Sequence, residues 1–248
     1  MKAMILAAGL GTRLGPLTDG RPKALVHIAG RTLLEITLFR LRAFGVRELV
    51  INVHHFADEI FCYLKANNNF GMRIEVSHEE TLLDTGGGLK RVASFFLDGS
   101  SSLDEPFILH NVDVMSNIDL QTMAQFHTEN RALATLAVQH RESSRYLLFD
   151  EQLQLCGRQA EPDYPPELVR PCLQAQKLGF SGIHVISPRL FARMPEGNTF
   201  SIITLYLQLA GEGERILAFR ADECYWRDLG TPDSLSRAAE DLRQKALL

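Results

Sequence analysis

The stretch MKAMILAAGLGTRLGPLTDGRPKAL, residues 1–25, decides the fold of the N-terminal part of the chain. Its apolar run over residues 2–8 predicts a buried strand, because glycines bound the run on its C-terminal side. The glycine loop that follows carries Arg13, and Lys23 comes directly after a proline. Glycines let backbone N–H groups approach a phosphate, and a guanidinium and an ammonium suit a polyphosphate. A strand and turn with surface charges is the alternative.

Two familiar phosphate-binding loops do not fit this stretch. The P-loop pattern GxxxxGK[ST] is absent. The dinucleotide fingerprint GxGxxG fails because Leu14 stands at its third glycine position and Gly15 comes one residue late. What remains is a glycine loop that carries its own guanidinium.

Strands and helices alternate downstream of this loop. Apolar runs predict strands at residues 48–53, 72–79, 106–114 and 132–139, and helical spacing predicts helices at residues 32–45, 57–68, 88–96 and 119–130. Such alternation predicts βαβ units with right-handed crossovers. We therefore expect an α/β fold, a Rossmann-like doubly wound mixed sheet.

The pattern changes after Gln139. A hairpin is predicted around Asp150 and Glu151, and the Pro-rich, polar residues 158–178 are expected to form a loop or flap. A strand at 179–187, a helix at 201–213 and a strand at 215–221 follow. Thr231 is predicted to cap a closing helix that has Pro232 at its first position.

Composition excludes several classes of protein. The net charge of −4 argues against a general nucleic-acid binder, and no apolar run approaches the ~20 residues of a membrane helix. The N-terminus lacks the layout of a signal peptide, so a cytoplasmic protein is expected. The four cysteines are widely spaced without a CxxC pair, which favours reduced, structural thiols.

The residues GLGTRLGPLTDGRPKAL match the GxGTRxxPLTxxxPK motif of the sugar-1-phosphate nucleotidylyltransferases, the NDP-sugar pyrophosphorylases. The resemblance continues through LLDTGGGL, NVDV, GFSGIHVISP and WRDLGTPDSL, and so covers nearly the whole chain. It implies one nucleotidyltransferase domain of GT-A-like fold over residues 1–248, without a β-helix extension. Residues 1–140 would form its nucleotide-binding half, and residues 141–248 its sugar-binding half with a flap.

The resemblance implies the reaction of a nucleoside triphosphate with a sugar 1-phosphate to give an NDP-sugar and pyrophosphate. Arg13 and Lys23 would act on the phosphates and, with Asp113, form the catalytic set. Nucleotide-binding positions would be Leu6, Ala8, Gly9, Gly11, Thr12 and Gly87. Sugar-binding positions would be Asn111, Ser181 and Gly182.

Two aspartates are implied metal ligands. Asp113 lies at the C-terminal end of the predicted strand at 106–114, and Asp228 lies shortly before a Gly-Thr-Pro turn. The resemblance implies that they converge on Mg²⁺, which prefers oxygen ligands. A sugar 1-phosphate, with a second pKa of about 6, is largely dianionic at neutral pH and needs no general base.

The TGGG form of the segment at residues 85–88 resembles N-acetylmuramate-1-phosphate uridylyltransferases and mannose-1-phosphate guanylyltransferases. A Glu-Lys-Pro triplet common among relatives is absent, although Lys177 lies nearby. Two alternatives stay open: a catalytically inactive NDP-sugar-binding module, and a cytidylyltransferase for phosphocholine, with Trp226 available for an aromatic cage. A monomer or a homodimer is expected, without nucleic-acid or membrane partners.

Overall fold

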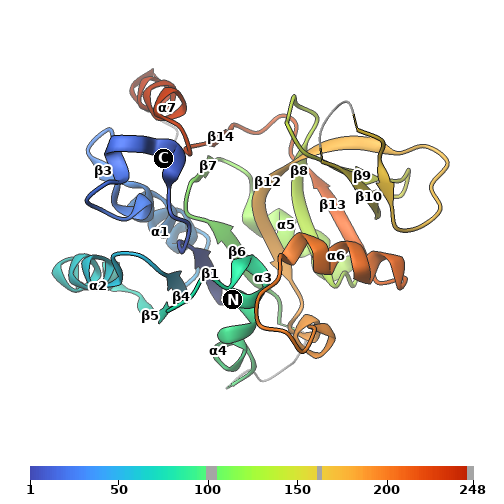
Figure 1. Cartoon of the computed structure of the whole chain (residues 1–248), viewed down its shortest axis with the longest axis horizontal. Coiled ribbons are helices and arrows are strands. Elements are labelled where there is room, and N and C mark those ends of the chain that lie inside the picture. Colours follow the sequence, from blue (N-terminus) through green and yellow to red (C-terminus); the bar gives the residue numbers. More distant parts are fainter. Residues whose placement is uncertain (99–104, 161–163, 245–248) are drawn as a thin grey trace. The chain divides into compact units, whose positions relative to one another are not determined.

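The computed structural model describes residues 1–98, 105–160 and 164–244, which fold into two compact units (Figure 1). Unit 1 consists of Met1–Leu82, His110–Ile118 and the C-terminal segment from Cys224. Unit 2 consists of Leu83–Leu109 and Asp119–Glu223. The chain therefore leaves unit 1 twice and returns to it twice.

Unit 1 begins with the predicted strand and the glycine loop. Its helices and strands are β1 (Ala3–Leu6), η1 (Thr12–Thr18), η2 (Lys23–Leu25), β2 (His27–Ile28), β3 (Arg31–Thr32), α1 (Leu33–Ala43), β4 (Glu48–Val53), α2 (Ala57–Ala66), η3 (Asn68–Gly71), β5 (Arg73–His78), β7 (Val114–Ser116), β14 (Trp226–Asp228) and α7 (Pro232–Gln244). The strand β6 (Phe107–Asn111) carries the chain from unit 2 back into unit 1.

The strands β1, β4 and β5 pair in parallel, with Ala3 opposite Leu49 and Leu49 opposite Ile74. The side chains of β1 and β4 are almost entirely apolar and buried, as expected of parallel strands covered on both faces. This arrangement confirms the predicted α/β fold. It also places the glycine loop directly after the carboxyl end of β1, the edge where such sheets bind ligands.

The sequence analysis predicted one strand over residues 106–114, and this prediction is wrong in detail. The structure has two strands, β6 and β7, with Val112 and Asp113 between them. The short strand β7 then pairs antiparallel with β14, a strand that the sequence pattern did not reveal. A strand of three residues, such as β7 or β14, is too short to show a periodic pattern in the sequence.

Unit 2 holds a mixed sheet. Its helices and strands are α3 (Asp84–Arg91), α4 (Ala93–Leu97), α5 (Leu120–Glu129), β8 (Ala134–Gln139), β9 (Tyr146–Phe149), β10 (Leu155–Gln159), β11 (Glu167–Leu168), β12 (Gln176–Ile186), η4 (Pro188–Arg193), α6 (Ile202–Gly211) and β13 (Ile216–Arg220). The strand β8 pairs antiparallel with β12 and parallel with β13. The strands β9, β10 and β11 continue antiparallel from β12.

Several local predictions are confirmed. The hairpin of β9 and β10 turns at Asp150, whose carboxylate accepts the backbone N–H groups of Gln152 and Gln154 at 2.9 Å. The helix predicted at residues 119–130 is α5, with Asp119 as its cap, and the hydroxyl of the predicted cap Thr231 accepts the Ser234 N–H at the start of α7. The prediction of a loop or flap at residues 158–178 is wrong in part, because this segment contains the end of β10, the strand β11 and the start of β12. Residues 161–163 lie outside the described part of the chain.

The sequence analysis predicted one helix over residues 88–96, whereas the structure has two, α3 and α4, and α3 begins earlier, at Asp84. The glycines of the segment at residues 85–88 lie inside α3. The backbone N–H groups of Gly86 and Gly87 donate to the carbonyl of Phe200 at 2.9 and 3.2 Å. Close packing explains the residue type, because a Cβ atom on Gly86 would lie 2.3 Å from the Phe200 ring. None of the described helices is long and apolar enough to cross a membrane.

Candidate active site

The loop after β1 has a fixed shape. Gly11 has a φ of 70°, in the left-handed region that favours glycine. A Cβ atom there would lie 3.0 Å from the Cγ2 atom of Thr18 and 3.1 Å from the Cβ atom of Lys23. The hydroxyl of Thr18 lies within hydrogen-bond distance of the carbonyls of Gly11 and Gly15. Thr18, which the sequence analysis did not single out, therefore holds the loop around Lys23.

Lys23 lies in the short helix η2, directly after Pro22. Its ammonium group donates a short hydrogen bond to the Asp113 carboxylate. Both side chains are largely buried, with 11% and 17% of their surface exposed. The structure thus brings together two predicted catalytic residues that are 90 positions apart in the sequence.

Arg13 and Asp228 form a second pair of opposite charges. Their closest nitrogen and oxygen atoms are 3.8 Å apart, and 64% of the Arg13 side chain is exposed. Asp228 also accepts the Gly230 N–H at 2.8 Å, and a Cβ atom on Gly230 would lie 2.5 Å from the Arg13 guanidinium. An exposed ion pair at this distance contributes little stabilising energy. Arg13 is therefore able to turn to another anion at small cost.

The pairing of β7 with β14 brings the two predicted metal ligands near one another. Asp228 pairs with Val114, the residue after Asp113, and the Leu229 N–H donates to the Asp113 carbonyl at 2.7 Å. The guanidinium of Arg40 on α1 donates to the carbonyls of Ser116 and Ile118 and fixes the far end of β7.

The strand β14 is held from the other side by α7. Arg227 donates to the carboxylate of Asp241 at 2.8 Å, and the hydroxyl of Tyr225 donates to the same carboxylate at 2.7 Å. These contacts fix the backbone on the N-terminal side of Asp228. Arg227, Tyr225 and Asp241 could have been found only with knowledge of the β7–β14 pairing.

The predicted nucleotide-binding residues of unit 1 lie at the end of β1 and in the loop after it: Leu6, Ala8, Gly9, Gly11 and Thr12. A buried amide supports this end of β1, because Asn52 on β4 accepts the Ala7 N–H at 2.9 Å. Asn52 in turn donates to Glu79 at 2.8 Å. The polar Asn52 inside the apolar run ELVINV is the sequence signal for this support. Asn111, predicted to contact sugar, is the last residue of β6, two positions before Asp113.

Unit 2 carries the other three predicted residues. Gly87 is buried in α3, where a Cβ atom would lie 2.0 Å from the Asn198 carbonyl oxygen, so packing alone requires a glycine there. Ser181 and Gly182 lie where the register of β12 with β8 shifts between Phe180 and His184. Gly182 has a φ of 72°. Irregularities of this kind redirect side chains and are frequent next to active sites.

Asp113 and Asp228 are suitable ligands for a hard divalent cation. Among the residues that the structure describes, no group of three or more His, Cys, Asp or Glu side chains could hold a metal ion. Mg²⁺ does not require such a cage, since it is commonly bound by one or two carboxylates together with substrate phosphates and water. Two carboxylates on adjacent backbone segments beside the glycine loop therefore fit this ion.

Residues 2–155 match the nucleotidyl transferase family. The chain is 32% identical to the N-acetylmuramate alpha-1-phosphate uridylyltransferase of Caulobacter vibrioides, over 94% of this chain and 93% of that protein. It is 28% identical to the mannose-1-phosphate guanylyltransferase of Mycobacterium tuberculosis, over 97% of this chain and 64% of that protein. The chain thus spans about two thirds of the length of this second relative.

The fold is shared with a solved structure from Bacillus anthracis, titled as a putative glucose-1-phosphate thymidylyltransferase in complex with a sucrose. The TM-score is 0.80 at 17% sequence identity, and the match covers 99% of this chain and 96% of that one. At this identity the similarity concerns the fold alone.

Proposed function

The chain belongs to the nucleotidyl transferase family and is a sugar-1-phosphate nucleotidylyltransferase, and we propose that it transfers a uridylyl group to N-acetylmuramate 1-phosphate. The products are UDP-N-acetylmuramate and pyrophosphate. Similarity to the Caulobacter enzyme along nearly the full length of both chains supports this pair of substrates.

One observation carries the choice of site: two cation–carboxylate pairs lie beside a glycine loop at the carboxyl end of β1. Lys23 is paired with Asp113, and Arg13 with Asp228. A triphosphate would take over the two cations as partners. The two carboxylates would then be left to hold a divalent cation, so every charge keeps a partner.

In this proposal, the reacting oxygen belongs to the phosphate group of the sugar 1-phosphate. It forms a bond to the α-phosphorus of UTP while the bond from that phosphorus to the bridging oxygen breaks and pyrophosphate leaves. Lys23 donates hydrogen bonds to the α-phosphate, where charge builds up in the transition state. Arg13 and the backbone N–H groups of Gly11 and Thr12 hold the β- and γ-phosphates. Positioning and fixed charge supply catalysis of this type.

Asp113 and Asp228 would hold Mg²⁺ in this proposal. When bound, the ion supplies positive charge between two anionic substrates. The carboxylates are available for this role only after Lys23 and Arg13 have turned to the phosphates. A bound triphosphate would therefore free Asp113 and Asp228 by taking over their cationic partners.

The remaining assignments stay proposals. Leu6, Ala8 and Gly9 would contact the nucleoside, Asn111 the sugar, and Ser181 and Gly182 the sugar from β12. Gly87 would line the base, although its packing against Asn198 already requires a glycine. Lys177 on β12 is exposed and is a candidate partner of the sugar phosphate.

A second candidate uses GTP and mannose 1-phosphate, and the similarity to the mycobacterial enzyme supports it. No described contact favours an inactive binding module or a phosphocholine cytidylyltransferase over these two reactions. The similarity found supports sugar-1-phosphate chemistry instead.

Pyrophosphate release tests the proposal directly. Purified protein is assayed with UTP, GTP, CTP and dTTP against N-acetylmuramate, mannose, glucose and N-acetylglucosamine 1-phosphates and phosphocholine, with and without Mg²⁺. The expected result is metal-dependent release with UTP and N-acetylmuramate 1-phosphate. Release only with GTP and mannose 1-phosphate would support the second candidate. UDP-sugar binding without release from any pair would favour the binding module.

A further inference from the structure

A pocket of about 300 Å³ lies in unit 2, at the turn after α5 and the end of β12. It is lined by His127, Thr128, Arg131, Ala132, Ser187 and Arg189. Ser187 lies five residues beyond Gly182, about 17 Å along an extended strand. None of the lining residues belongs to the site proposed above.

The charge of this pocket is not balanced by its own lining. Two of the six lining residues are arginines, and none is an acid. Arg189 donates through Nη2 to the carbonyls of Arg131 and Ala132, both at 3.3 Å, and through Nε to the Ser187 hydroxyl at 3.0 Å. The described residues give Arg189 Nη1 and the Arg131 guanidinium no ion pair or hydrogen bond.

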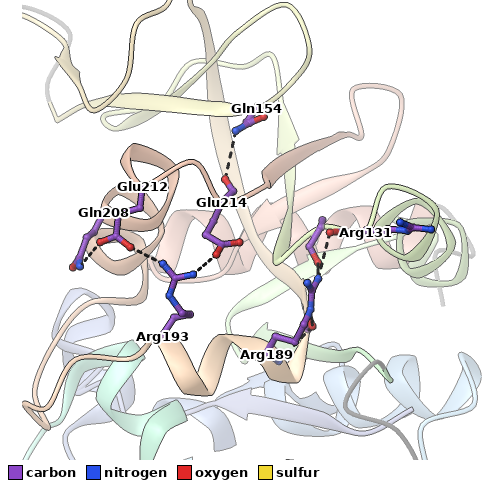
Figure 2. Close-up of polar contacts among 9 residues, drawn as sticks. Arg131, Gln154, Arg189, Arg193, Gln208, Glu212 and Glu214 are labelled. Carbon is purple, nitrogen blue, oxygen red and sulfur yellow. Dashed lines mark hydrogen bonds and ion pairs between the residues drawn. The ribbon is translucent and has the colours of Figure 1, made fainter.

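A neighbouring arginine shows the contrast. Arg193, in the same short helix η4, lies between Glu212 and Glu214 and forms ion pairs with both (Figure 2). Arg189 meets only backbone carbonyls and a hydroxyl (Figure 2). The carbonyls that accept from Nη2 of Arg189 belong to the turn that follows α5. Both arginines line the pocket, and among the described residues neither the Arg131 guanidinium nor Nη1 of Arg189 is paired with a carboxylate.

Buried donors line the same pocket. His127 is 3% exposed, and its Nδ1 atom lies 2.9 Å from the Thr135 hydroxyl, which directs its Nε2 atom away from that partner. Ser187 is 4% exposed, and its oxygen accepts two bonds from Arg189, so its O–H remains a donor. Burial, and then the charge of Arg189, lower the pKa of His127 to about 4, so its imidazole is neutral at pH 7.

We propose that this pocket is a second anion site, which binds the phosphoryl group of a small phosphorylated molecule through Arg131, Arg189, His127 and Ser187. Guanidinium groups donate two parallel hydrogen bonds to phosphate oxygens, and a neutral imidazole and a hydroxyl add one each. The volume is at the lower end for small-molecule sites, so it accommodates a phosphoryl group together with part of the molecule that carries it. The inference does not depend on the proposed reaction.

The test is binding, measured on His127 itself. Protein labelled with ¹³C-histidine is titrated with inorganic phosphate or glucose 6-phosphate, neither of which is a substrate of the proposed reaction. The ring C–H signal of His127, identified by comparison with His127→Gln, is expected to shift with saturation. Tighter binding of glucose 6-phosphate would assign a phosphorylated metabolite, and equal binding would assign phosphate itself.

Three variants separate this site from the catalytic one. Removal of one guanidinium–phosphate contact in Arg131→Gln is expected to weaken binding about tenfold. The control Arg193→Gln removes one positive charge from the same helix, η4, and should stay within about twofold, because Arg193 is already paired. Arg189→Gln tests the second guanidinium, with circular dichroism to verify folding.

An unshifted His127 signal with both ligands, or wild-type affinity in Arg131→Gln, overturns the proposal. Pyrophosphate release by Arg131→Gln should match the wild type in either case.

Discussion

At the scale of single residues, Lys23 is the clearest test of the proposed chemistry. Lys23→Ala removes the hydrogen bond that we propose for the α-phosphate, and we expect turnover to fall about 10²–10³-fold. The exposed Lys65→Ala, on α2, is the matched control and should retain wild-type turnover. Steady-state kinetics together with urea unfolding separate catalysis from stability. Turnover equal to that of the wild type would show that Lys23 has no role in the reaction.

Asp113 and Asp119 form a matched pair for the metal. Asp113→Asn is expected to raise the Mg²⁺ concentration needed for half-maximal activity about tenfold or more, because an amide is a weaker ligand than a carboxylate. Asp119→Asn should lower the free energy of unfolding by well under about 1 kcal/mol, because asparagine also caps helices. It should leave the Mg²⁺ titration unchanged. A titration curve for Asp113→Asn that overlays the wild type would reject the ligand role.

His127 predicts how stability depends on pH. Its pKa is lowered from 6.5 to about 4 in the folded protein, first by burial and then by the charge of Arg189. Between pH 4 and pH 6.5 the unfolded chain binds more protons at this histidine than the folded chain does. The free energy of unfolding therefore decreases as the pH falls from 6.5 towards 4, by about 1.4 kcal/mol per pH unit. Above pH 6.5 this histidine has no such effect. Urea unfolding in phosphate-free buffer should give a flatter slope for His127→Gln than for the wild type.

At the scale of elements, α3 shows packing overriding helix propensity. Gly→Ala normally stabilises a helix interior by about 1 kcal/mol. In Gly86→Ala, the new Cβ atom would lie 2.3 Å from the Phe200 ring, and overpacking of this kind costs about 1–3 kcal/mol. We expect Gly86→Ala to be net destabilising in thermal unfolding. The control Gly197→Ala meets no atom within 4 Å and should be neutral or slightly stabilising. A stabilised Gly86→Ala would mean that Phe200 moves aside easily.

Long elements could be predicted from the sequence and short ones could not. The runs that became β1 and β4 are continuous and apolar, and α1 has helical spacing, so their type followed from pattern. The strands β7 and β14 have three residues each and exist because each pairs with the other. The predicted helix began only at residue 88 because the intrinsic preference of glycine opposes a helix, whereas in the structure Gly86 and Gly87 lie inside α3 and pack against Phe200 and Asn198.

The same limit applies to the candidate site. The motif around Arg13 and Lys23 identified both cations, but not their ion pairs with Asp228 and Asp113. Thr18, Asn52 and Arg40 were missed because their roles are hydrogen bonds to backbone carbonyls and N–H groups that only the folded chain brings within reach.

At the scale of the whole molecule, the C-terminal segment is part of unit 1. A chain that ends at Glu223 would lack β14 and α7, and with them Asp228 and the buried Leu235 and Ala238. We expect this truncation to lose pyrophosphate release entirely and to unfold at lower urea concentration or aggregate. A chain that ends at Gln244 keeps both elements and serves as the control. Activity in the shorter chain would show that β14 is dispensable.

The interleaving of the two units has a consequence for synthesis on the ribosome. Residues of unit 1 emerge first and last, and those of unit 2 emerge between them. At about 5–20 residues per second, Arg13 waits roughly 10 to 40 s before Asp228 is made. Unit 2, with fewer interruptions, can fold while unit 1 is still unfinished. In a nascent chain, β7 would therefore lack its partner strand β14 until the final segment leaves the exit tunnel.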